Sequence, residues 1–146
     1  MKKPQVVDLN ESIRHMAELA QTQIQPNRIQ LDLKLSSKSP QVLANPADLS
    51  RALLDLVTNA IDAVSNAGSS GPIQITSAVI RDHVLVSVVE DIPTKETAAR
   101  LDLPQGIIRE IGGDLWMSTS ETCGTTFIID LPSASLNQTG EHGAVS

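Results

Sequence analysis

The segment that decides the fold reads Leu53-Leu54-Asp55-Leu56-Val57-Thr58-Asn59-Ala60-Ile61-Asp62-Ala63-Val64. Its apolar residues recur every three or four positions, which predicts an amphipathic helix with one buried face. Asn45 and Pro46 precede the segment as a capping residue and a first-turn proline, and a glycine-rich stretch follows Asn66. The sequence therefore predicts one long helix from Pro46 to about Asn66. Its buried stripe comprises Leu49, Ala52, Leu53, Leu56, Ala60 and Val64.

A strip of polar residues runs beside this apolar stripe. At 3.6 residues per turn, Asp55, Asn59 and Asp62 occupy positions i, i+4 and i+7, so their oxygens project to the same side. Asp48 and Asn66 lie on the same strip. Such oxygens suit Mg²⁺, which takes one or two protein oxygens together with waters and substrate phosphates. Spacing alone favours a solvated helix face, so the case for a metal site depends on the surrounding sequence.

The remaining elements are predicted from periodicity and from breaker residues. We expect helices over 8–26 and 103–111, strands over 29–35, 73–80, 84–89, 114–118 and 125–131, and a short extended piece at 42–43. This order favours an α+β fold of two layers, with helices on one face of a mixed or mostly antiparallel sheet. We expect one domain over residues 1–134 and a disordered tail or linker over 135–146. Trp116 and Phe127 are expected to pack in the core or across strands.

Composition excludes several classes of function. The chain has 146 residues, a formal net charge of −6, one Trp, one Phe and no Tyr. Acidity and the lack of aromatic stacking residues argue against a nucleic-acid partner. A single Cys excludes an internal disulfide framework. No apolar run approaches the roughly 20 residues of a membrane helix, and no apolar signal-peptide region follows residues 1–4. We therefore expect a cytoplasmic domain with no membrane segment in this chain.

The long helix closely resembles the N box in the catalytic domain of sensor histidine kinases, a family within the gyrase, Hsp90, histidine kinase and MutL ATPase superfamily. Four further stretches agree with that family in order, namely Val7–Glu11, Asn45–Leu49, Gly112–Leu115 and Gly124–Pro132. They resemble the start of the first helix, the segment leading into the N box, the end of the closing helix and the final strand. The resemblance implies a two-layer α/β sandwich of the histidine-kinase/Hsp90-type ATPase fold.

The resemblance also implies roles for individual residues. Asn59 would hold Mg²⁺ against the phosphates of ATP, with Asp62 beside it at the nucleotide site. Asp55 occupies the position where relatives place Asn or a Glu that acts as general base. Asp91 corresponds to the acid that accepts a hydrogen bond from the adenine amino group, although a turn residue that ends the strand is an equal alternative. Arg100 can pair with phosphate.

The sequence departs from the family where relatives have glycines. Pro93 and Lys95 stand at the two glycine positions after Asp91, and proline fixes φ and removes a donor. The mobile lid and glycine-rich phosphate loop are reduced to residues 92–102, which contain no glycine. Bare backbone N–H groups in such loops bind phosphate. Within the next helix, Pro104 is expected to shorten or kink it.

These losses favour a degenerate site. Micromolar binding corresponds to about 8 kcal/mol, and three lost hydrogen bonds to phosphate cost about 5–9 kcal/mol in total. Our leading interpretation is a regulatory or docking domain of a two-component phosphorelay, with weak or no ATP binding. Its expected partner is a response-regulator receiver domain or a histidine-kinase dimerisation domain.

Two alternatives remain open. The domain could bind Mg-ATP and phosphorylate a histidine on another domain or chain, or it could be the scaffold domain of a histidine phosphotransferase. No acceptor hairpin is recognised before the domain, which counts against the second alternative unless the chain is a fragment. His15 lacks the acceptor pattern of the family, so we expect it to be an ordinary surface histidine.

Overall fold

The computed structural model describes residues 3–91, 101–120 and 124–134. The expected tail at 135–146 lies outside these residues, so the domain boundary at 134 stays a prediction. In chain order the elements are β1 (Gln5–Asp8), α1 (Leu9–Leu19), α2 (Gln21–Asn27), β2 (Leu31–Lys34), β3 (Gln41–Ala44), α3 (Pro46–Asn66), β4 (Ile73–Ile80), β5 (His83–Glu90), α4 (Asp102–Glu110), β6 (Asp114–Ser120) and β7 (Gly124–Pro132).

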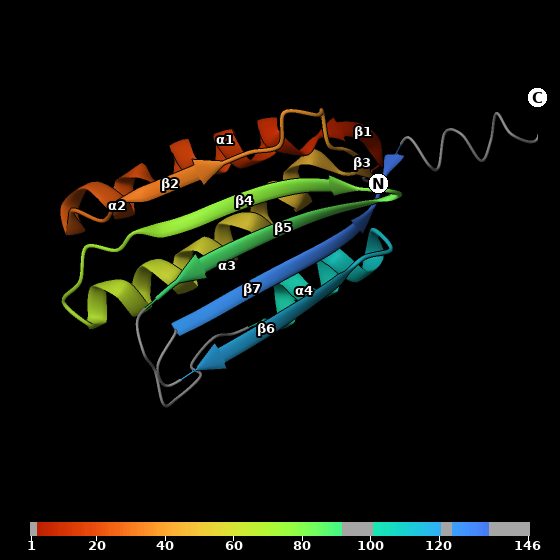
Figure 1. Cartoon of the computed structure of the whole chain (residues 1–146). Coiled ribbons are helices and arrows are strands. Elements are labelled where there is room, and N and C mark those ends of the chain that lie inside the picture. Colours follow the sequence, from red (N-terminus) through yellow and green to blue (C-terminus); the bar gives the residue numbers. More distant parts are fainter. Residues whose placement is uncertain (1–2, 92–100, 121–123, 135–146) are drawn as a thin grey trace, which may run out of the picture.

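Five of the strands form one mixed sheet in the order β2-β4-β5-β7-β6. β2 runs parallel to β4, and the other neighbours are antiparallel. β1 and β3 pair antiparallel as a separate two-stranded sheet. The helices lie behind the five-stranded sheet in Figure 1, and no described helix covers its other face. The expected two-layer α+β fold, with a mixed sheet and helices on one face, is confirmed.

The long helix α3 has the bounds that the sequence predicts. Asn45 caps it, because its side-chain oxygen accepts a hydrogen bond from the backbone N–H of Asp48 at 3.0 Å. Pro46 occupies the first turn, where its missing N–H has no intrahelical partner. Eight residues of the helix are buried, namely Leu49, Ala52, Leu53, Leu56, Val57, Ala60, Ile61 and Val64. Each large aliphatic side chain among them contributes about 1.5–3 kcal/mol by leaving water.

The structure differs from the sequence prediction at the N-terminal end of the chain. The single helix expected over 8–26 is two helices, α1 and α2, which meet at Ala20. Pro26 does not end the second helix, which continues to Asn27 and stops where Arg28 adopts a left-handed conformation with φ of 54°. β1 was not predicted, since its residues do not alternate between buried and exposed positions.

Pro104 lies in the first turn of α4, at its third residue. A proline there costs no intrahelical hydrogen bond, because the N–H groups of the first turn have no intrahelical acceptor. The helix begins at Asp102, one residue earlier than expected, and runs for nine residues. Gly113, just beyond it, packs so closely that a Cβ would lie 2.6 Å from Cδ2 of Leu131 in β7.

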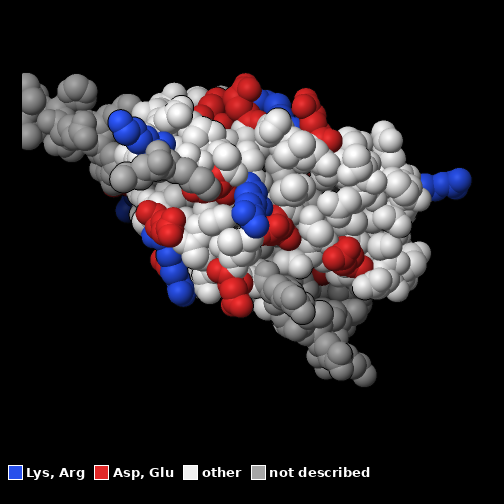
Figure 2. Space-filling view, turned by 180° about the vertical axis from the view of Figure 1, so that it is seen from behind, with Lys and Arg blue, Asp and Glu red and all other residues white. Residues whose placement is uncertain are grey.

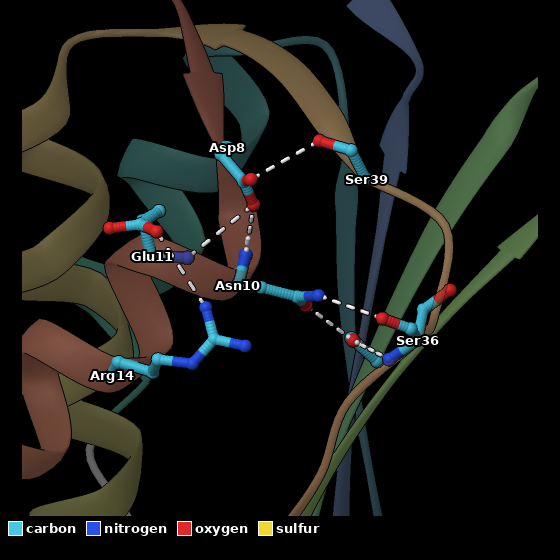
Figure 3. A network of polar contacts seen from close by, with 7 residues as sticks. Asp8, Asn10, Glu11, Arg14, Ser36 and Ser39 are labelled. Carbon is cyan, nitrogen blue, oxygen red and sulfur yellow. Dashed lines mark hydrogen bonds and ion pairs between the residues drawn. The ribbon is translucent and has the colours of Figure 1, made fainter.

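A polar network fixes the start of α1 against the sheet (Figure 3). The carboxylate of Asp8 accepts hydrogen bonds from the backbone N–H of Asn10 at 2.9 Å and of Glu11 at 3.4 Å. The buried side chain of Asn10 donates to the carbonyl of Ser36 at 3.0 Å and accepts from the hydroxyl of Ser77 at 2.7 Å. The Ser77 hydroxyl also accepts from the backbone N–H of Ser36 at 2.8 Å. Helix α1, the connection after β2 and strand β4 are thereby held together.

Replacing Asn10 with alanine tests this network. We expect Asn10→Ala to lower the free energy of unfolding by about 1–3 kcal/mol, because Ser77 and the Ser36 carbonyl lose a buried partner. Ser39→Ala is the matched control, since the exposed Ser39 hydroxyl donates to Asp8 at the edge of the same network. It should change stability by less than about 0.5 kcal/mol. Equal losses in urea unfolding would contradict the role given to Asn10.

Candidate functional site

One edge of α3 is occupied by hydrogen bonds to α2. The side-chain amide of Gln23 donates to the hydroxyl of Thr58 at 3.3 Å. The hydroxyl of Ser65 donates to the side-chain oxygen of Asn27 at 3.2 Å. Thr58 and Ser65 are seven residues apart and so share one edge of the helix. That edge faces the N-terminal helices.

The first residue of the polar strip of α3, Asp48, lies toward α4. Asp48 lines a pocket together with Ile107 and Glu110 of α4. Asp55 is seven residues, and Asn59 eleven residues, beyond Asp48, so all three side chains share one edge of the helix. The structure therefore places the start of the strip beside α4, and the shared site of Asp55, Asn59 and Asp62 stays a prediction.

The members of the strip differ in exposure. Asp55 and Asn59 are half-buried, whereas Asp62 and Asn66 are exposed. A carboxylate and an amide oxygen, each partly withdrawn from water, form a donor set that suits Mg²⁺ when the remaining ligands are phosphates and waters. The described residues hold no cluster of three or more His, Cys, Asp or Glu side chains placed to bind a metal ion. The metal-binding role of Asn59, the general-base position of Asp55 and the place of Asp62 at the nucleotide site all stay predictions.

Two adjacent acids end β5 and differ sharply in environment. Asp91, the acid chosen from the sequence, is exposed immediately after the strand. Glu90 is the last residue of the strand and only 2% exposed, because it lies on the same core-facing side as Val86 and Val88. Sequence reasoning overlooked Glu90, although strict alternation along β5 would have assigned it to the helix side. The role of Asp91 stays a prediction, and Glu90 is a second candidate for it.

The acidic end of β5 and the C-terminal half of α3 lie at the same end of the molecule (Figure 1). Glu90 pairs in register with Ile73, the first residue of β4, which follows the short loop after α3. The pocket lined by Asp48 lies at the other end, beside the start of α3 and the end of α4. Asn59 and Glu90 are thus contributed by elements that converge at one end of the helical layer.

Gly124 accounts for the tight approach of β7 to this end. Its φ is 89°, and a Cβ at this position would overlap the carbonyl oxygen of Glu90 and lie 2.6 Å from Cα of Asp91. Glycine is the residue that adopts such a conformation without a steric penalty. The first residue of the final strand therefore determines where the two acids sit.

Three residues discussed from the sequence, namely Arg100, Lys95 and Pro93, lie outside the described residues.

The charged side chains on the helical face are mixed in sign. In Figure 2, acidic and basic side chains are interspersed among uncharged ones on this face, without one large patch of a single sign. Among the described helices, none is long and apolar enough to cross a membrane.

Comparison with known proteins finds curated relatives of the chain, but no family model matches it. The sensor histidine kinase ZraS of Escherichia coli K12 is 29% identical over 88% of this chain and 31% of its own length. Sporulation kinase E of Bacillus subtilis is 26% identical over 90% of this chain and 21% of its own length. The chain thus spans less than a third of these curated relatives.

Solved structures resemble the chain over nearly its whole length. The nucleotide-free catalytic domain of histidine kinase ThkA has a TM-score of 0.75 and 28% identity, covering 90% of this chain and 96% of that domain. A structure of ThkA in complex with the response regulator TrrA has a TM-score of 0.75 and 26% identity, covering 89% of this chain and 42% of that one.

A substitution at Gly124 tests how the acidic end is built. We expect Gly124→Ala to lower the free energy of unfolding by at least about 1–2 kcal/mol, because alanine is strained at this φ. Amide NMR signals of Glu90 and Asp91 should shift strongly. Gly106→Ala is the control, since nothing lies within 4 Å of that site in α4, and it should stabilise by about 0.5–1 kcal/mol. A Gly124 variant as stable as the native chain would contradict the assignment.

Proposed function

We propose that this chain, which is similar to sensor histidine kinases and has the fold of their catalytic domain, keeps the floor of a nucleotide site but binds Mg-ATP weakly or not at all. Its role in this proposal is that of a regulatory or docking domain in a two-component phosphorelay. The observation that carries the proposal is that α3 presents half-buried Asp55 and Asn59 and that β5 ends in two acids, while residues 92–101 contain no glycine.

The floor of the site consists of oxygen-bearing side chains. In this proposal Asn59 and bound phosphates share Mg²⁺, Asp55 occupies the general-base position, and Asp62 lies at the exposed rim. Mg²⁺ would supply neutralisation of phosphate charge at this place. Glu90 or Asp91 accepts the hydrogen bond from the adenine amino group. We favour Glu90 because a buried acceptor competes less with water than an exposed one.

The loss of phosphate binding is argued from the residues 92–101, which connect β5 to α4. Neither acid is followed by glycine at the second or fourth position. After Asp91 these positions hold Pro93 and Lys95, and after Glu90 they hold Ile92 and Thr94. Side chains at these positions hinder the approach of backbone N–H groups to base and phosphate. Arg100 can pair with phosphate and recover part of the lost free energy. It cannot replace three backbone donors.

Calorimetric titration with Mg-ATP tests this proposal. We expect a dissociation constant weaker than about 1 mM, since about 5–9 kcal/mol of phosphate contacts are lost. Asn59→Ala, Glu90→Gln and Asp91→Asn serve as matched variants. Micromolar binding in the native chain that Asn59→Ala abolishes would contradict the proposal. It would favour an active kinase domain that phosphorylates a histidine on another domain or chain.

The docking role makes a separate prediction. The ThkA complex contains a response regulator, which supports a receiver domain as the partner class. Nucleotide-free protein immobilised on a surface should retain a cognate receiver domain, and adding Mg-ATP should change the retained amount by less than about twofold, because a ligand far below saturation shifts little. Retention that requires Mg-ATP would contradict a docking role. The histidine phosphotransferase alternative requires, in addition, an acceptor histidine that becomes phosphorylated.

A further inference from the structure

We propose that two copies of this chain associate through strand β6, whose outer edge pairs with β6 of the second copy in an antiparallel ladder. β6 is the last strand of the five-stranded sheet, and β7 is its only described neighbour (Figure 1). In such an edge strand, alternate residues direct their N–H and C=O groups away from the sheet. Apart from the ladder with β7, none of the described backbone hydrogen bonds involves β6. These outward groups can therefore pair with another strand.

The two edges of the sheet differ in how well they are protected against such pairing. The opposite edge is β2, which has only four residues and includes Asp32 and Lys34. Short edge strands and charged side chains are features by which proteins prevent sheets from pairing edge to edge. β6 has seven residues, and after Asp114 it contains no charged residue and no proline. β6 is therefore the edge that is open to a further strand.

The sequence of β6 is compatible with itself in the antiparallel direction, which favours a second copy as the occupant. When residues 114–120 of the two copies overlap fully, Met117 lies opposite Met117 of the second copy, and Asp114 lies opposite residue 120 of the second copy. The two Asp114 carboxylates are then about 20 Å apart, at opposite ends of the ladder. A parallel pair would instead place these like charges side by side, which is destabilising. Antiparallel pairing also gives the closed two-fold symmetry of most homodimers.

Trp116 supplies apolar contact at the centre of this interface. Its side chain is 50% exposed, and it lies in register with Ile128 of β7 on the sheet face that no described helix covers. In the fully overlapping register the two Trp116 residues are diagonal neighbours across the two-fold axis, within reach of each other's aromatic rings. Pairing thus removes two indole rings from water in addition to forming backbone hydrogen bonds.

Sedimentation equilibrium of the nucleotide-free chain tests this inference. Two seven-residue strands with one Trp each bury less than the roughly 1,200–2,000 Å² of a stable interface, so we expect a weak dimer with a dissociation constant of about 0.1–1 mM. The average mass should rise toward that of a dimer over this range. Trp116 is the only Trp of the chain, and its emission should shift to shorter wavelength as the dimer forms. Alternate amides of β6 should exchange more slowly with deuterium at high concentration.

Ser118→Glu is the variant that tests the interface directly. Residue 118 is exposed on β6 and lies opposite Trp116 of the second copy in the proposed register. A carboxylate there should weaken the dimer at least about fivefold, because charged side chains protect an edge strand. Gln74→Glu is the matched control and should leave the dimer unchanged. Gln74 lies in the same row of register partners as Ser118, but on β4, away from the β6 edge.

Three results would overturn the proposal. The first is a monomer at every concentration up to about 1 mM. The second is an equal effect of Ser118→Glu and Gln74→Glu on association. The third is a dimer in which exchange of the β6 amides does not depend on concentration, since the copies would then meet through another surface, such as the face of the sheet.

Discussion

Burial of the apolar face of α3 against the sheet fixes the direction of every polar side chain on that helix. Eight of its 21 residues are buried, and a rotation of the helix by one residue would expose several of them to water at about 1.5–3 kcal/mol for each large side chain. The first residue of the polar strip, Asp48, therefore lies beside α4, and Thr58 and Ser65 form hydrogen bonds with α2. Core packing of α3 thus determines where Asp55 and Asn59 lie, without any contribution from a ligand.

Glycines fix the neighbouring elements in the same way. Gly113 lets the end of α4 approach β7, and Gly124 lets the start of β7 approach Glu90 and Asp91. These contacts involve backbone, which cannot move aside as a flexible side chain can. The chain has glycine at these two close approaches and no glycine in residues 92–101, between β5 and α4.

Local signals explain which parts of the fold could be predicted. The bounds of α3 follow from a cap, a first-turn proline and a stripe within one segment, and the strands over 73–80 and 125–131 follow from alternation. The bond between Asn10 and Ser77 joins residues 67 positions apart, and no local pattern predicts it. Trp116 is 50% exposed, since it lies on an edge strand and on the sheet face that has no helices, which depends on sheet order.

In the proposed function, Asp55, Asn59 and Glu90 form the floor of a site that holds nucleotide weakly. The direct measurement is an amide NMR titration of the chain with Mg-ATP. We expect shift changes confined to residues 55–62 and to Glu90, without saturation below about 1 mM, and unchanged signals at Leu43 and Ile107. Saturation at micromolar concentration, or changes centred on Leu43 and Ile107, would contradict it.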